Sequence, residues 1–214
     1  MKFSGTFKLE DTTTEEVWLA LSDPVMIESA LPGCQFLVQV EEGTVDFDAL
    51  RKEYAGRDLE PSSDPEVIAE RAFVEGERYA AVIQIGVGPV NPTFETVVTI
   101  DHRDQPVMNA SGEGSAGDSS FEMASGMELS EIDNEVGVNW ETEADVFGRI
   151  AQMGQRVINP AANQVVKRFF SSVQSEIRKR EIGEDDRVGG VESQDNTDNN
   201  RSVVDRILGR SEGS

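Results

Sequence analysis

The sequence predicts an α+β fold in which a curved antiparallel sheet wraps around a long C-terminal helix. From residue 79 to residue 146, apolar side chains recur at every second position, which is typical of antiparallel strands that bury one face. From residue 148 to residue 179 the apolar period changes to three and four residues, which indicates an amphipathic helix. A strongly curved sheet buries such a helix against its concave face. Folds of this kind often leave a cavity between the two.

The elements before residue 79 are predicted from alternation and from turn-forming residues. A strand, two short helices and a second strand are expected in that order, at 2–9, 11–21, 24–30 and 35–40. Asp11 or a nearby Thr caps the first helix, and Asp23-Pro24 separates the two helices. Residues 45–53 are predicted as a further strand and residues 54–66 as a loop.

The alternating region is predicted to form five strands. They are expected at 79–87, 94–100, 106–112, 119–130 and 136–146, with a Gly-rich turn after residue 112. Pro160 lies within the helical segment and lacks a backbone donor, so we expect the helix to kink or split near Asn159.

Composition divides the chain into a domain at 1–180 and an acidic tail at 181–214. The length of 214 residues suits one domain with a tail. Residues 183–200 have the composition of a disordered linker. Residues 202–209 then place apolar side chains at helical spacing, as in a short amphipathic segment.

The formal net charge of −22 is unevenly distributed along the chain. It results from 41 acidic and 19 basic residues, and it excludes nucleic acid as a partner because phosphate binding requires clustered Lys and Arg. Such acidity favours a salt-loving host over an ordinary acidic protein, since salt screens self-repulsion. Residues 148–180 are the exception, with seven basic side chains against Glu176 alone. This face is either a solvated surface or a contact for anionic lipid or an acidic partner.

Several sites are excluded or disfavoured by the residue types present. One Cys and one His make an internal disulfide, a zinc site or a Ser-His-Asp triad improbable, so we assign no catalytic and no metal-binding residue. No apolar run of about 18 residues and no signal peptide are present, so a cytoplasmic location is expected.

Three single features have an ordinary structural explanation. Residues 112–117 match GxGxxG, but a strand rather than a helix follows, so the motif predicts a hairpin and not a nucleotide site. His102 is expected in a solvated hairpin loop, although a general base is conceivable. Cys34 is expected to be a small buried hydrophobe rather than a reactive thiol.

A Met-rich and aromatic set is predicted to line an apolar cavity between sheet and helix. Met adapts to irregular ligands, whereas the alternative is that these side chains simply fill the core. The candidate ligand-binding residues are Ile85, Phe94, Met108, Phe121, Met123, Met127, Trp140, Met153, Val157 and Phe169.

Short motifs, in matching order along the chain, resemble those of the CoxG family, the G-subunit family of carbon monoxide dehydrogenase. They are KFSGTFKL at the start, Glu16-Val17-Trp18, Leu21-Ser-Asp23-Pro24, Leu31-Pro32-Gly33-Cys34, Gly86-Val-Gly88-Pro89-Val90, the segment 112–117, and 148–156 leading to Phe169-Phe170. The resemblance spans about residues 2–177. Pro160 and the long acidic segment 54–72 depart from the family pattern.

The resemblance implies a helix-grip fold of the START/polyketide cyclase-like (SRPBCC) superfamily. It implies a non-enzymatic accessory protein that binds a lipid or quinone, requires no other cofactor, and assists membrane recruitment of, or electron transfer from, a molybdenum CO dehydrogenase-type enzyme. Peripheral membrane contact would involve the Arg and Lys side chains of the C-terminal helix together with the tail. The alternatives are a cyclase or hydratase-like enzyme of the same superfamily, and an adaptor without a ligand.

Overall fold

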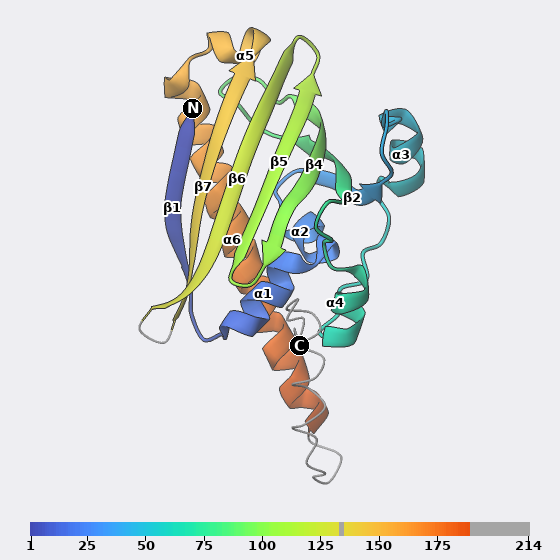
Figure 1. Cartoon of the computed structure of the whole chain (residues 1–214), viewed down its shortest axis with the longest axis vertical. Helices are drawn as coiled ribbons and strands as arrows, with labels where there is room; N and C mark the ends of the chain where they lie inside the picture. The colour runs from blue at the N-terminus through green and yellow to red at the C-terminus, as the bar shows by residue number, and fades with distance from the viewer. Residues whose placement is uncertain (133–134, 189–214) are drawn as a thin grey trace, which may run out of the picture.

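A single antiparallel sheet curves around the C-terminal helix in the computed structural model, which describes residues 1–132 and 135–188 (Figure 1). Within these residues the sheet has seven strands in the order β1-β7-β6-β5-β4-β3-β2. The strands are β1 (Lys2–Leu9), β2 (Cys34–Val40), β3 (Arg78–Gln84), β4 (Thr93–Asp104), β5 (Val107–Ala116), β6 (Ser119–Ile132) and β7 (Glu135–Phe147). The predicted helix-grip fold is therefore confirmed.

Most helices lie on the concave face and along one edge of the sheet, and one packs on the outer face of β2 and β3. They are α1 (Thr14–Ser22), α2 (Pro24–Ala30), α3 (Phe47–Tyr54), α4 (Pro65–Arg71), α5 (Gly148–Gln152) and α6 (Gln155–Val188). Helix α6 crosses behind the sheet, and α1 and α2 meet its lower half (Figure 1). Helices α3 and α4 lie on the side of β2 (Figure 1).

The first helix begins at a capping box that its sequence encodes. The Thr13 hydroxyl accepts a hydrogen bond from the Glu16 backbone N–H, and the Glu16 carboxylate accepts one from the Thr13 backbone N–H at 2.7 Å. Two of the unpaired donors at the helix start are thereby satisfied. Asp23 caps α2 in the same way, by accepting from the Val25 N–H ahead of Pro24 at the first position.

The strand predicted at 45–53 is wrong, because this segment forms α3. Asp46 caps the helix by accepting from the Ala49 N–H at 3.0 Å. Phe47, Leu50 and Tyr54 then fall at helical spacing and pack against the outer face of β2 and β3. Short apolar runs do not distinguish strand from helix by alternation, and here the cap and the three-and-four spacing were the informative signals.

The loop predicted at 54–66 ends in a second unpredicted helix. The Asp64 side chain accepts from the Glu66 N–H at 2.9 Å, and Pro65 occupies the first position of α4. This is the same Asp-Pro start that begins α2. Helix α4 buries Ile68 against Leu19 of α1, and so it covers the end of the domain.

The break in the C-terminal helix lies at Met153 and Gly154, and the predicted split near Asn159 is wrong. Gly154 has a φ of +74°, a conformation that glycine adopts without strain. Pro160 lies inside α6. The helix continues to Val188, so residues 181–188 of the predicted tail are helical, and residues 189–214 lie outside the described residues.

The Gly-rich segment extends β5 to Ala116 instead of ending it at residue 112. Only Gly117 of this segment adopts a left-handed conformation, with a φ of +57°, at the turn into β6. A Cβ at Gly114 would collide with the Phe121 ring, so glycine at this position allows Phe121 to lie across the neighbouring strand. The hairpin interpretation of the GxGxxG match is therefore correct.

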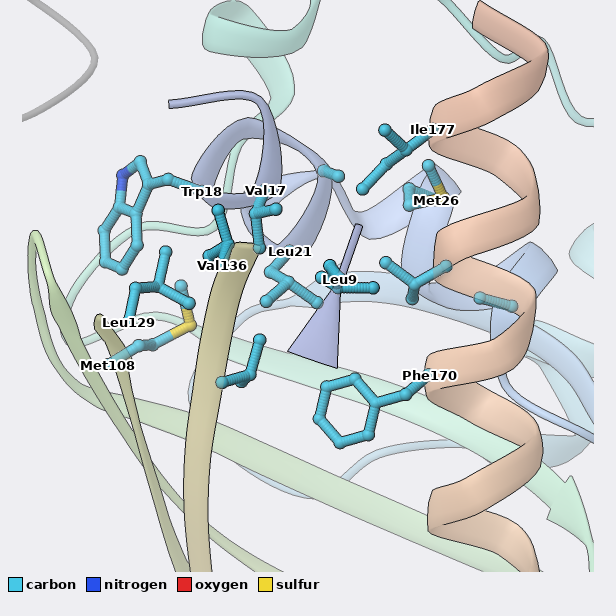
Figure 2. Packing of buried hydrophobic residues seen from close by; sticks show 14 residues of the cluster. Leu9, Val17, Trp18, Leu21, Met26, Met108, Leu129, Val136, Phe170 and Ile177 are labelled. Carbon is cyan, nitrogen blue, oxygen red and sulfur yellow. The ribbon is translucent and has the colours of Figure 1, made fainter. Parts of the chain in front are cut away.

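The main core lies where α1, α2 and α6 meet the lower half of the sheet. Figure 2 shows Leu9, Leu21 and Phe170 converging between α1, β1 and α6. Trp18 is 1 % exposed and lies beside Leu129 and Met108 in this cluster. This packing joins β1, α1 and α2 to α6. The middle of the sheet then faces the remaining part of α6.

Candidate functional site

The ten predicted ligand-binding residues divide between two apolar clusters on the concave face. We call these the lower cluster, at the α1–α2 end, and the upper cluster, at the α5 end. Met108, Met127, Trp140 and Phe169 belong to or pack against the lower cluster. Ile85, Phe94, Phe121, Met153 and Val157 belong to or pack against the upper cluster. Met123 lies between the two clusters along β6, because Phe121 packs against the upper cluster and Met127 against the lower one.

Two rows of side chains cross the sheet between these clusters. The strand register places Val98, Gly112, Met123 and Ala144 in one row, and Ala110, Ser125, Thr142 and Phe3 in the next. All eight residues are only partly buried, although they lie on the face that α6 covers. Ala162 and Val165 of α6 are also partly buried. We call these eight sheet residues the central rows, and they are less completely buried than the cores of the two clusters.

Hydroxyl groups are the polar functions nearest the central rows. The Ser125 and Thr142 hydroxyls form a hydrogen bond of 2.7 Å with each other. The Thr96 hydroxyl is buried without a hydrogen-bond partner, although the residue is only 2 % exposed. A buried hydroxyl without a partner can bind a polar atom of a ligand. These groups are uncharged at neutral pH and can orient a ligand, but they are weak general acids or bases.

His102 does not lie in a hairpin loop, because it is part of β4. Its side chain is 46 % exposed and its Nδ1 lies 3.3 Å from Glu75 Oε2. His102 pairs with Asn109 in the sheet, next to Arg103 and Met108, whose side chains lie toward the core. The imidazole is therefore on the outer face, away from the central rows.

An open groove runs along one flank of α6, beside the edge of the sheet formed by β2. Its volume is about 990 Å³, and we call it the flank groove. One wall is the α2–β2 turn, the other is α6, and loop residues after α3 close one end. The lining residues are Glu28–Gln35, Gly56, Arg57, Leu59, Gln164, Lys167, Arg168, Ser171, Ser172 and Ser175.

None of the ten predicted ligand-binding residues is among the residues that line the flank groove. The sequence contained two signals for it, namely the basic pair Lys167-Arg168 and serines at helical spacing after that pair. Neither signal identifies a groove by itself, because the opposite wall comes from residues more than 100 positions away in the chain. The role of the predicted residues in ligand binding stays a prediction.

The turn that forms one wall of the groove is fixed by the neighbouring strand. Gly33 has a φ of +78°, and a Cβ there would overlap the carbonyl oxygen of Gln84. The Gln84 N–H in turn donates to the Gly33 carbonyl at 2.9 Å. Glycine is required at this position for both reasons, so the groove wall is a rigid feature.

A buried ion pair lies at the floor of the groove. Arg57 donates to the Glu28 carboxylate at 2.6 Å, and the Leu37 N–H donates to the same oxygen at 2.9 Å. The Glu28 side chain is 5 % exposed, so its charge is compensated inside the protein. Arg57 also lies over the Tyr54 ring, with 5.1 Å to the ring centroid.

Cys34 lies in the same groove as a half-buried thiol. Burial, followed by the nearby Glu28 charge, raises the pKa of Cys34 to about 12. Its Sγ donates to the Phe36 carbonyl at 3.3 Å. A thiol with this pKa is neutral and unreactive at physiological pH, in agreement with its expected role as a small hydrophobe.

No cluster of three His, Cys, Asp or Glu side chains suited to a metal ion occurs within residues 1–132 and 135–188. None of the helices there combines the length and the hydrophobicity needed to cross a bilayer.

The curved sheet and the long helix that it grips define the class of this protein as a helix-grip fold. The chain belongs to the CoxG family, the G-subunit family of carbon monoxide dehydrogenase, whose family model matches residues 71–178. A search of curated protein sequences gives no significant match.

Solved structures agree with the helix-grip fold. The chain is similar to a conserved protein from Geobacillus kaustophilus, with a TM-score of 0.61, 22% identity, and coverage of 84% of this chain and 96% of that one. It is also similar to the Zhui aromatase/cyclase from a Streptomyces species, with a TM-score of 0.53, 12% identity, and coverage of 89% and 99%. Ara h 8.0201 gives a TM-score of 0.52 at 12% identity, with coverage of 84% and 98%. At these identities the likeness establishes the fold alone.

Proposed function

We propose that this chain is a carrier or accessory protein that holds a hydrophobic ligand, a quinone or another lipid, between the sheet and α6. The observation that supports the proposal is the partial burial of the central rows, between two well-packed apolar clusters. Packed protein interiors rarely leave such a region open without a purpose. Its walls are apolar apart from hydroxyls, which suits a largely hydrocarbon ligand with a few polar atoms.

We propose a binding function in preference to catalysis by a cyclase or hydratase-like enzyme. Such enzymes need an acid or base directed at the ligand. Among the described residues, the buried carboxylates of Asp23 and Glu28 are held by Arg71 and Arg57, and His102 lies on the outer face. The central rows themselves offer Ser125 and Thr142, which are poor proton-transfer groups. These observations favour a carrier.

We further propose that the ligand-bound protein serves a molybdenum CO dehydrogenase-type oxidoreductase, as the family description suggests. A quinone is a suitable cargo because it accepts electrons and dissolves in the membrane. The basic side chains of α5 and α6 would contact anionic lipid on the inner face of the membrane, which would bring carrier and enzyme together.

The carrier proposal is tested by identifying bound lipid and by measuring quinone binding. Lipids are extracted from protein purified from its native host and analysed by mass spectrometry, and the quenching of intrinsic tryptophan fluorescence is measured as a short-chain quinone is added. Ala144→Phe places a ring in the central rows, whereas Ala124→Phe places the same ring on the outer face of the neighbouring strand. We expect Ala144→Phe to weaken quinone binding by about tenfold or more, equivalent to at least ~1.4 kcal/mol, and Ala124→Phe to leave it unchanged.

Two results would contradict the carrier proposal. One is the absence of both co-purified lipid and saturable quinone binding. The other is equal binding by the two phenylalanine variants, with unfolding temperatures that show both to be folded. A hydrophobic ligand that is chemically altered during incubation would instead support the enzyme alternative.

A further inference from the structure

We propose that the flank groove is a second binding site, separate from the central rows, that takes an amphiphile with one anionic head group. The groove has a volume of about 990 Å³, which is at the upper end of the range for small-molecule sites. Its two walls differ in chemistry, and this difference defines the ligand.

The α6 wall of the groove is basic and rich in hydroxyl groups. Lys167 and Arg168 both line the groove and are exposed, and neither forms an ion pair with any residue in the described part of the chain. Ser172 lines the groove about one turn further along the helix, and Ser175 about two turns further. Ammonium, guanidinium and hydroxyl donors together match a carboxylate or a phosphate.

The positive charge of this wall is not neutralised by an acidic side chain of the described residues. The chain carries 41 acidic side chains, and most of the described basic side chains elsewhere pair with one of them, as Arg178 does with Glu10 at 3.2 Å. No acidic residue occurs between residues 146 and 175. The one carboxylate inside the groove, Glu28, already accepts from Arg57 and the Leu37 N–H, so it does not neutralise Lys167 or Arg168.

The opposite wall of the groove supplies the apolar contact. Leu31, Pro32 and Leu59 line it and are all only partly buried, so each offers accessible hydrocarbon surface. An anionic head group on Lys167 and Arg168 would place its hydrocarbon chain against these residues. A neutral ligand would leave the two charges without partners, and a simple anion would leave the apolar wall unused.

This second site is tested with cis-parinaric acid, a fluorescent fatty acid, and with its neutral methyl ester. The probes are titrated into the full chain below their critical micelle concentrations. We expect the acid to bind at least about tenfold more tightly than the ester, with a preference that falls as salt is added. The Lys167→Gln/Arg168→Gln double variant should lose this preference, whereas Arg156→Gln should keep it. Arg156 is the matched control because it is an exposed arginine of α6 outside the groove that forms no ion pair with a described residue.

The source of the head group is distinguished by displacement of the bound parinaric acid. Stronger displacement by lysophosphatidic acid than by oleate indicates a phosphate, and the reverse indicates a carboxylate. Both outcomes support an anionic amphiphile if lysophosphatidylcholine is a weaker competitor than either.

Several results would overturn the second site while leaving the carrier proposal intact. The first is equal affinity for the acid and the ester, and the second is a loss of the preference for the acid in Arg156→Gln as large as in the double variant. The third is the absence of saturable parinaric acid binding. The fourth is loss of that binding in Ala144→Phe, which would place the probe in the central rows. Thermal unfolding serves as the folding control. If quinone binding fails while the preference for the acid is retained, the carrier proposal is contradicted and the second site in the flank groove is supported.

Discussion

Single charged residues in this acidic chain are stabilised by specific partners wherever they are buried. Asp23 is fully buried, accepts from the Val25 N–H that begins α2, and pairs with Arg71 at 2.8 Å. Glu28 is paired with Arg57 in the same manner. Removing either arginine would leave a buried carboxylate uncompensated, which commonly costs about 3–5 kcal/mol. Each pair also joins helix α2 to a segment far along the chain.

Cys34 provides the residue-scale prediction, which concerns pH. Burial raises its thiol pKa to about 12, so the reactive thiolate is roughly a thousandfold scarcer than in an unperturbed thiol below pH 9. We expect alkylation by iodoacetamide at pH 8 to be slower by about that factor in the folded protein, and to accelerate up to pH 12. The measurement is labelling followed by intact-mass spectrometry, with the urea-unfolded chain as reference. Equal labelling rates in the folded and unfolded chains would show that the thiol is not protected.

The connection from β7 through α5 to α6 depends on two glycines, one at each end of α5. Gly148 has a φ of +75° and begins α5 directly after β7. Gly154 has a φ of +74° and precedes α6. A Cβ at Gly148 would overlap the backbone carbonyl of Asp118, whereas one at Gly154 would meet open space. Glycine is therefore required at 148 because a Cβ has no room there and because φ is positive. At 154 it is required by the positive φ alone.

Alanine substitutions should separate these two requirements. We expect Gly154→Ala to cost about 1 kcal/mol, the usual penalty for a left-handed Cβ residue. Gly148→Ala should cost at least about 3 kcal/mol, because the backbone at Asp118 must move as well. Urea unfolding followed by circular dichroism gives both values. Similar decreases in the free energy of unfolding for the two variants would show that the close approach of residue 148 to Asp118 does not affect stability.

The molecule as a whole separates its charges in space. Residues 1–147 carry a net charge of −23, whereas residues 148–180, which form α5 and most of α6, carry a net charge of +6. Arg149, Arg156, Lys167 and Arg168 form no ion pair with a described residue. An anionic surface would repel the body and attract this one face, so contact would be oriented. The salt-rich host expected from the composition is a separate prediction that no structural observation tests.

Vesicle co-sedimentation tests the proposed membrane contact at this scale. We expect the full chain to bind phosphatidylglycerol vesicles more than phosphatidylcholine vesicles, and to release as salt increases. The Arg149→Gln/Arg156→Gln variant should lose roughly 2 kcal/mol of binding, about 1 kcal/mol for each charge. A chain ending at Val188 separates the contribution of the tail from that of the helix. Binding that is unaffected by the arginine variant would assign the contact elsewhere or remove it.

Much of the fold and part of the site were predictable from sequence because their signals are local. The capping box at Thr13 and Glu16, the Asp23-Pro24 boundary and the strand alternation all act within a few residues. Residues 45–53 were mispredicted because a short apolar run is compatible with both periods, and the outer face of β2 and β3 selects the helix. Pro160 was expected to kink or split the helix near Asn159, yet α6 runs through Pro160 and the break occurs at Gly154, between α5 and α6.

The sequence alone determined the helix-grip fold, the family resemblance and the basic character of the C-terminal helix. Each of these depends on apolar periodicity, short motifs or local charge, which can be read from residues close together in the chain. Only the tertiary structure decided which of those residues share a site. It divided the ten predicted lining residues between two clusters, left the central rows partly open, and brought Lys167 and Arg168 beside the α2–β2 turn to form a groove. The physical reason is that an interior cavity or a groove depends on how distant surfaces fit together, and that fit depends on packing across the whole domain.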